Sequence, residues 1–124
     1  MTITSAILSQ LNYDIGYIIP PSLTSRWKLL IGNTKYNLPQ VLSQVGELDM
    51  AFLDDDTEYR HRMFEYNMIW PHLRIGGCII SDNINLSSAF FDFLTYAKCR
   101  SLAIKYKLGL MMKSARSCHI NLDY

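Results

Sequence analysis

Apolar and polar positions along the chain alternate in short blocks, and these blocks predict strands and helices in turn. A short apolar run closed by polar residues or glycine is typical of a buried strand. Four such runs predict strands over residues 3–8, 27–31, 48–53 and 78–80. The first run could instead be the start of a buried helix. The sequence thus predicts a sheet whose strands are separated by other elements.

The last part of the chain carries the pattern of a hairpin. Residues 102–106 and 110–113 form two short runs, and the segment between them holds Lys107, Leu108 and Gly109. Two runs separated by a few residues that include a glycine are typical of paired antiparallel strands. We therefore expect two closing strands joined by a tight turn.

The segments between the predicted strands carry the signals of helices. Pro39 in a first turn and Gly46 as a stop predict a short helix over residues 40–45. A second helix is expected from Thr57 onward, because apolar side chains there recur every three or four positions. The members of this stripe are Tyr59, Met63, Tyr66, Trp70 and Leu73.

A third helix is predicted before the hairpin, with Ser87 or Ser88 as its N-cap. Between the second helix and the strand at 78–80, the pair Gly76-Gly77 predicts a turn. The apolar stripe of the third helix consists of Phe90, Phe93, Leu94 and Ala97.

Strands that alternate with helices of these lengths indicate βαβ units. The predicted fold class is therefore α/β, with a mostly parallel sheet and a C-terminal antiparallel hairpin. With 124 residues and no internal repeat or linker, the chain has room for one core. We expect a single domain over residues 1–124.

The overall composition indicates which classes of partner and which cellular compartment to expect. An apolar fraction of 49% indicates a folded chain, and a formal net charge of +1 gives no field that would attract nucleic acid or an anionic membrane. No run reaches the roughly 18 apolar residues of a membrane span, and the start lacks the features of a signal peptide. The three cysteines, Cys78, Cys99 and Cys118, have neither zinc-binding nor disulfide spacing. A cytoplasmic protein without nucleic-acid or membrane partners is expected.

Oxygen-bearing side chains follow three successive predicted strands. In an open parallel sheet, ligands bind outside the carboxyl ends of the strands, so these side chains are expected to face one crevice. Hard oxygen ligands suit Mg²⁺ or Ca²⁺. A positively charged cofactor would also relieve the repulsion between adjacent carboxylates. The residues concerned are Asn33, Thr34, Asp54, Asp82 and Asn83.

Three stretches of the chain are similar to the pattern of a known family. The block "LDMAFLDDDTEYRHRMFEYNMIWPHLRIGGCIISDN" resembles the second half of class I S-adenosylmethionine-dependent methyltransferases, in which a strand ending in Asp leads through a helix to "LxPGG" and a further acidic strand end. "IGNTKYNLPQVL" is similar to the preceding block, and "KLGLMMK" to the closing hairpin. The resemblance covers residues 27–113 and implies a Rossmann-like methyltransferase sheet.

Small-molecule O-methyltransferases, including the cation-dependent catechol type, give the nearest resemblance. By that match the implied metal ligands, for Mg²⁺, are Asp54, Asp82 and Asn83. The resemblance also implies that Asn33 and Thr34 lie near the adenosine of S-adenosylmethionine and that Asp54 contributes to cofactor binding. The implied partner is a small-molecule methyl acceptor.

The chain also departs from the family's pattern. The glycine-rich cofactor loop of type ExGxGxG and the first strand are both missing from the sequence, and Ser9 or Gln10 stands where an acidic residue would bind the ribose. Thr57 replaces the Lys or His that related enzymes place three residues after the strand-end Asp. His61 is one substitute as a base, although a histidine on a helix face is more often solvated. No catalytic residue is assigned.

These departures leave several alternatives open. The sequence is interpreted as an N-terminally truncated methyltransferase-like domain, incomplete or weakly active. Its rival is a non-catalytic relic, or a subunit whose sheet is completed by a partner strand or by a second copy. A receiver-like signalling domain also gathers aspartates at strand ends, but Gly76-Gly77 before the strand at 78–80 does not fit it. Asp55 and Asp56 have a simpler interpretation, as caps of the following helix.

Overall fold

The structure is a computed structural model, and it describes residues 16–115 apart from the side chains of residues 100–103. The chain divides into two compact units, Met1–Asn37 and Leu38–Tyr124, and each is described by itself. The strand predicted over residues 3–8 lies outside the described residues. The expectation of a single domain stays a prediction.

The described part of the first unit holds a 3₁₀ helix, η2, over Pro21–Arg26. Residues 27–31 form no strand, so that prediction is wrong. Proline at the start of η2 presets the helical φ angle. The Trp27 side chain then lies against Gly16, which has a φ of +88° and leaves no room for a side chain of its own. Trp27 of this run therefore takes part in local packing and not in a sheet, while Ile31 is 76% exposed.

Helix α1 spans Thr34–Val45 and is longer than the predicted segment 40–45. It begins early because Asn33 caps it: the Asn33 side-chain Oδ1 accepts a hydrogen bond of 2.9 Å from the Lys35 N–H. Pro39 lies inside the helix and not at its first turn. Gly46, with a φ of +76°, follows the last helical residue, so the predicted stop is confirmed.

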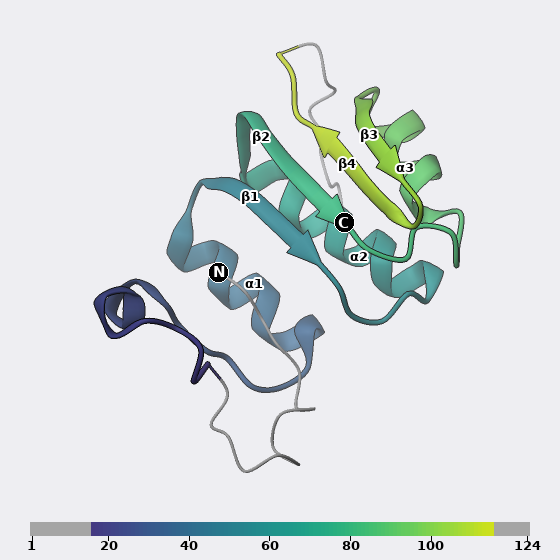
Figure 1. The fold of residues 1–124 in the computed structure, drawn as a ribbon. Coiled ribbons are helices and arrows are strands. Elements are labelled where there is room, and N and C mark those ends of the chain that lie inside the picture. The colour runs from purple at the N-terminus through teal and green to yellow at the C-terminus, as the bar shows by residue number, and fades with distance from the viewer. Residues whose placement is uncertain (1–15, 116–124) are drawn as a thin grey trace. The chain divides into compact units, whose positions relative to one another are not determined.

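The second unit contains a four-stranded mixed sheet (Figure 1). Strands β1 and β2 are parallel, whereas β4 is antiparallel to both β2 and β3. The spatial order is β1-β2-β4-β3. The C-terminal hairpin is thus confirmed, but only one of the three described pairings is parallel, and the expectation of a mostly parallel sheet is not met. The strands are Leu48–Leu53 for β1, Leu73–Ser81 for β2, Arg100–Lys105 for β3 and Leu108–Met112 for β4.

Gly76 and Gly77 lie within β2 and do not form the turn that the sequence predicts. The Gly76 N–H donates to the Lys113 carbonyl at 2.7 Å, and the Lys113 N–H donates to the Gly77 carbonyl at 2.9 Å. A Cβ atom at Gly77 would stand 2.9 Å from the Asp49 carbonyl oxygen on the neighbouring strand. Glycine is required here because the two backbones approach closely.

The hairpin turn lies at Tyr106 and Lys107, since Lys105 pairs with Leu108. The predicted turn at residues 107–109 is therefore displaced. Gly109 belongs to β4, where the ring of Phe90 occupies the space that a side chain would need. A glycine in a strand thus marks a close contact with a helix and not a turn.

Helices α2, Tyr59–Ile69, and α3, Ala89–Tyr96, lie on the same face of the sheet (Figure 1). A short 3₁₀ helix, η3, over Trp70–His72 continues α2. The predicted stripe is confirmed in its second half, where Tyr66, Trp70 and Leu73 are buried, whereas Tyr59 is 41% exposed. The Phe93 ring centroid lies 5.2 Å from that of Tyr66 and 5.5 Å from that of Trp70. This aromatic cluster of Tyr66, Trp70, Phe90 and Phe93 is the centre of the core.

Candidate functional site

The carboxyl ends of β1 and β2 lie side by side. Leu53 pairs with Ser81, and the Asp82 N–H donates to the Leu53 carbonyl at 2.9 Å. Asp54 and Asp82, the next residues of the two strands, therefore start from the same edge of the sheet. This placement is the one that a parallel pair requires.

Asp82 is held by its immediate neighbours. Its Oδ1 atom accepts a hydrogen bond of 2.8 Å from the Asn83 N–H, and its Oδ2 atom lies 3.4 Å from the Lys107 ammonium. Asn83 has a φ of +56°, a conformation that asparagine tolerates better than most residues. The Lys107 side chain is 56% exposed, so this ion pair is one that a competing cation could displace at small cost.

Asp54 is exposed at the end of β1. Together with Asp82 and Asn83 it offers only oxygen donors, which fit the preference of Mg²⁺. Among the described residues, however, none of the hydrogen bonds or ion pairs found for Asp82 and Asn83 joins them to Asp54. The backbone brings Asp54 and Asp82 to one edge, while joint coordination of an ion stays a prediction.

Asn33 and Thr34 belong to the start of α1. The Asn33 side-chain oxygen caps the helix, and its backbone carbonyl accepts from the N–H groups of Tyr36 and Asn37 at 3.1 Å. Thr34 is the first helical residue. The capping role explains Asn33 without a ligand, and its proposed place near an adenosine stays a prediction.

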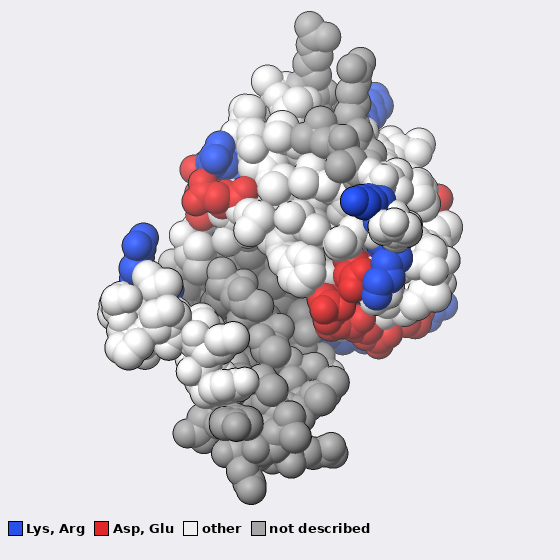
Figure 2. Space-filling model, in the orientation of Figure 1, with Lys and Arg blue, Asp and Glu red and all other residues white. Residues whose placement is uncertain are grey.

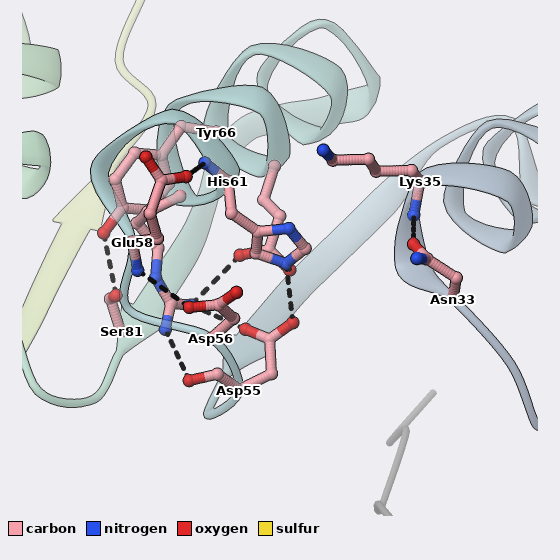
Figure 3. Close-up of polar contacts among 10 residues, drawn as sticks. Asn33, Lys35, Asp55, Asp56, Glu58, His61, Tyr66 and Ser81 are labelled. Atoms are coloured by element: carbon pink, nitrogen blue, oxygen red, sulfur yellow. Dashed lines mark hydrogen bonds and ion pairs between the residues drawn. The ribbon is translucent and has the colours of Figure 1, made fainter.

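A cluster of charged side chains lies directly after Asp54, and we call it the α2 charge cluster: Asp55, His61, Arg62 and Glu65 (Figure 3). The His61 Nε2 atom is 3.0 Å from the Asp55 Oδ2 atom and 3.4 Å from the Glu65 Oε1 atom. The Arg62 Nη1 atom is 3.2 Å from the Asp55 Oδ1 atom and 3.1 Å from the Glu65 Oε2 atom. Arg62 and Glu65 are only 3% and 2% exposed.

The turn into α2 positions this cluster. The Asp56 Oδ1 atom accepts from the Glu58 N–H at 2.9 Å, and the Glu58 Oε2 atom accepts from the His61 N–H at 3.0 Å. Glu58 is thus the N-cap residue that fixes the first turn of the helix. Residues three and four positions apart on a helix lie on one side, so Glu65 comes next to both His61 and Arg62.

Burial changes the acid–base properties of the cluster. Loss of solvation, and next a hydrogen bond with Asp55, raise the pKa of the Glu65 carboxyl to about 9, although Arg62 acts in the opposite direction. The neighbouring Tyr66 phenol has its pKa raised to about 12, chiefly by burial, and its Oη atom lies 2.7 Å from the Ser81 Oγ atom. Glu65 is therefore protonated near neutral pH. The positive charge of Arg62 is then paired with the Asp55 carboxylate.

The sequence is also similar to a known family of protein domains. The model of a methyltransferase domain family matches residues 5–84, which is more than half of the chain. This chain belongs to the methyltransferase domain family. The match includes α1, β1, α2 and β2, and with them the edge that carries Asp54 and Asp82. No curated protein matches the sequence.

The surface of this methyltransferase domain agrees with its composition. On the face drawn in Figure 2, acidic and basic side chains lie next to each other in small groups, and most of the described surface is uncharged. No helix among the described residues is long and apolar enough to cross a membrane.

Sequence reasoning missed the α2 charge cluster. The interpretation of His61 as a solvated side chain is wrong, because its side chain is 12% exposed and contacts Asp55. Asp56 does take part in the turn that leads into the helix, whereas Asp55 pairs with His61 and Arg62. Opposite charges at Arg62 and Glu65, three positions apart, were the available signal.

Proposed function

We propose that this chain is an S-adenosylmethionine-dependent methyltransferase that transfers a methyl group to an oxygen atom of a small molecule, with weak activity as the chain stands. The observation that supports it is the parallel pairing of β1 and β2, which starts Asp54 and Asp82 from one edge of the sheet. Oxygen donors at this edge could contact a cation or the positively charged cofactor of a methyltransferase. The cytoplasm, where thiols stay reduced, suits the free thiols of Cys78 and Cys99.

Each proposed site residue has a role that follows from its chemistry. S-adenosylmethionine supplies the methyl group on a positively charged sulfur. Asp54, which is exposed, is proposed to contribute its carboxyl group to cofactor binding, and Asn33 and Thr34 are proposed to lie near the adenosine. Asp82 and Asn83 would hold Mg²⁺ together with Asp54, and a hydroxyl group of the acceptor held there would lose its proton more readily. Positioning of the acceptor would provide most of the rate.

A non-catalytic role is the second candidate, and two observations favour it. The sequence has no glycine-rich cofactor loop, and Asn33 is already used as a helix cap. Strand β1 has one neighbour, β2, in the described sheet, and its Met50 and Phe52 side chains are 54% and 47% exposed. An edge strand with exposed apolar side chains can pair with another chain. In this alternative the domain is a subunit completed by a partner strand or by a second copy of itself.

Calorimetric titration with S-adenosylmethionine, with and without Mg²⁺, tests the proposal on the full chain. We expect measurable binding that Mg²⁺ and an acceptor such as a catechol strengthen together, and that Asp82→Asn weakens. Asp92→Asn is the matched control, because Asp92 is an exposed carboxylate on α3 that accepts from the Ser88 hydroxyl. Absence of heat under all conditions, with the protein folded by circular dichroism, would rule out the catalytic proposal and favour the subunit.

A further inference from the structure

Three donor atoms of the α2 charge cluster lie close to one another. They are Asp55 Oδ2, His61 Nε2 and Glu65 Oε1, and their ligand atoms all lie within 4.8 Å of one another. The His61 nitrogen stands 3.0 Å and 3.4 Å from the two carboxylate oxygens. A tetrahedral ion with bonds of about 2.0–2.1 Å separates its ligand atoms by about 3.3–3.4 Å. The two distances from the His61 nitrogen are therefore close to the spacing of ligand atoms in such a site.

The remaining oxygens of the two carboxylates are both taken by Arg62. Its Nη1 atom lies 3.2 Å from Asp55 Oδ1 and 3.1 Å from Glu65 Oε2. Each carboxylate thus presents one oxygen toward His61 and the other to the guanidinium. Outer groups that hold the second oxygen of a ligand in this way fix its orientation at a metal centre.

The charges and the access of the cluster are compatible with a cation. Coordination through both carboxylates would release the proton of Glu65. Two carboxylates and one guanidinium then carry a net charge of −1, which attracts a divalent ion. The Asp55 side chain is 35% exposed, whereas Glu65 is 2% exposed, so the cluster opens toward solvent on the Asp55 side. An ion could enter there and remain in contact with water as its fourth ligand.

The donor set selects the class of ion. One imidazole nitrogen with two carboxylate oxygens suits Zn²⁺ and neighbouring first-row metals, while Mg²⁺ prefers oxygen donors alone. We propose that Asp55, His61 and Glu65 form a three-ligand site for Zn²⁺ or a similar transition-metal ion, with Arg62 orienting both carboxylates. This site is separate from the Asp54, Asp82 and Asn83 set and does not depend on methyl transfer.

Titration of the full chain with Co²⁺, followed by its visible absorption, tests the site directly. The expected result is the intense absorption of tetrahedral cobalt at one ion per chain, displaced by Zn²⁺. His61→Gln should weaken Co²⁺ binding at least about tenfold, since even loss of an outer-shell group costs about 10–100-fold. Metal should also raise the melting temperature of the unchanged protein but not that of His61→Gln.

Matched variants separate this site from other donors in the chain. Asp92→Asn, at an exposed carboxylate on α3, should bind Co²⁺ as the unchanged protein does. His72→Gln should do the same, since the His72 Nδ1 atom contacts the Gly46 carbonyl at 2.8 Å. Cys118→Ser combined with His119→Gln removes donors that lie outside the described residues, and it too should leave binding intact. Loss of the cobalt signal in that double variant, or its persistence in His61→Gln, would overturn the proposal. A protein that binds no Co²⁺ while it is folded would overturn it as well.

Discussion

The first half of α2 buries charged side chains, whereas its second half and the following η3 bury aromatic rings. Arg62 and Glu65 are as inaccessible to solvent as Tyr66 and Trp70. The aromatic cluster needs only matching shapes, because apolar burial is not directional. The Arg62 guanidinium and the Glu65 carboxyl need partners at fixed distances, because a buried charged or polar group without a partner is costly. We therefore expect substitutions in the aromatic cluster to act through lost packing, and substitutions in the α2 charge cluster to act through lost hydrogen bonds and ion pairs.

The largest effect is expected in the aromatic cluster. Phe93→Ala removes a ring that contacts both Tyr66 and Trp70, and it should lower the free energy of unfolding by about 4 kcal/mol. Urea denaturation followed by circular dichroism measures this loss. Phe91→Ala is the control on the same helix, since Phe91 is 45% exposed, and it should cost less than about 1 kcal/mol. Equal losses in the two variants would contradict the assignment of the core.

A somewhat smaller loss is expected when the charge cluster is opened. Arg62→Met leaves Asp55 and Glu65 without their shared cation and should lower the free energy of unfolding by about 3 kcal/mol. The double variant Arg62→Met/Glu65→Met should recover a large part of this, because it removes the buried carboxyl as well. The same urea assay checks both variants. If the double variant is no more stable than the single one, pairing does not govern this half of the helix.

The pH dependence of stability sharpens the comparison further. The Glu65 pKa is about 9 in the folded chain and near its ordinary value of 4.5 in the unfolded one. Between these values unfolding releases a proton, so the free energy of unfolding falls as the pH rises from about 4.5 to about 9, by up to about 1.4 kcal/mol per pH unit. Denaturation with a metal chelator present, across this range, measures the slope. Glu65→Gln should flatten it, and an unchanged slope in that variant would assign the effect elsewhere.

The smallest effect is expected where the two halves of α2 meet. Tyr66→Phe keeps the ring in the aromatic cluster but removes the hydroxyl that contacts the Ser81 hydroxyl at 2.7 Å. Ser81 is buried, so the loss should be about 1 kcal/mol by thermal denaturation. Adding Ser81→Ala should restore part of the stability, because neither partner is then left without a hydrogen bond. A double variant that is less stable than Tyr66→Phe would argue against this pairing.

The sequence predicted the elements that its apolar pattern sets by itself. Strand β1 matches the predicted residues 48–53 because a polar residue and a row of aspartates bound its apolar run. Helix α2 follows from a stripe that packs on the sheet, and α3 follows in the same way. The bounds and types of these elements follow the local pattern, although Met50 and Phe52 of β1 and Tyr59 of α2 are exposed.

The errors arose where a distant contact decides the local structure. Gly77 is a strand residue because the Asp49 carbonyl lies close to it, and Gly109 because Phe90 does. Neither neighbour is visible in the local sequence, where glycine indicates a turn. The strand predicted over residues 27–31 failed because an apolar run alone does not reveal whether a neighbouring strand is present to pair with it.

The candidate site was predictable only in its backbone. Strand ends placed Asp54 and Asp82 at one edge, and the register of β1 and β2 agrees. Nothing was predicted from the sequence for Arg62 or Glu65. Their spacing is compatible with an ion pair but does not indicate burial, because charged residues are rarely buried. Which of two adjacent aspartates turns toward the helix depends on the Glu58 cap, which a sequence pattern does not specify.

The contacts of Lys113 determine how far the chain can be truncated from its C-terminal side without loss of described hydrogen bonds. The last described strand, β4, ends at Met112, yet the backbone of the next residue pairs with Gly76 and Gly77, and the Lys113 ammonium donates to the Trp70 carbonyl at 2.9 Å. Lys113, one residue past β4, therefore connects this strand to β2 and to η3, the short helix that precedes β2. A stop codon at position 113 would remove the partners of the Gly76 N–H and the Gly77 carbonyl and one of the two donors to the Trp70 carbonyl, whereas a stop codon at position 116 would keep all three hydrogen bonds.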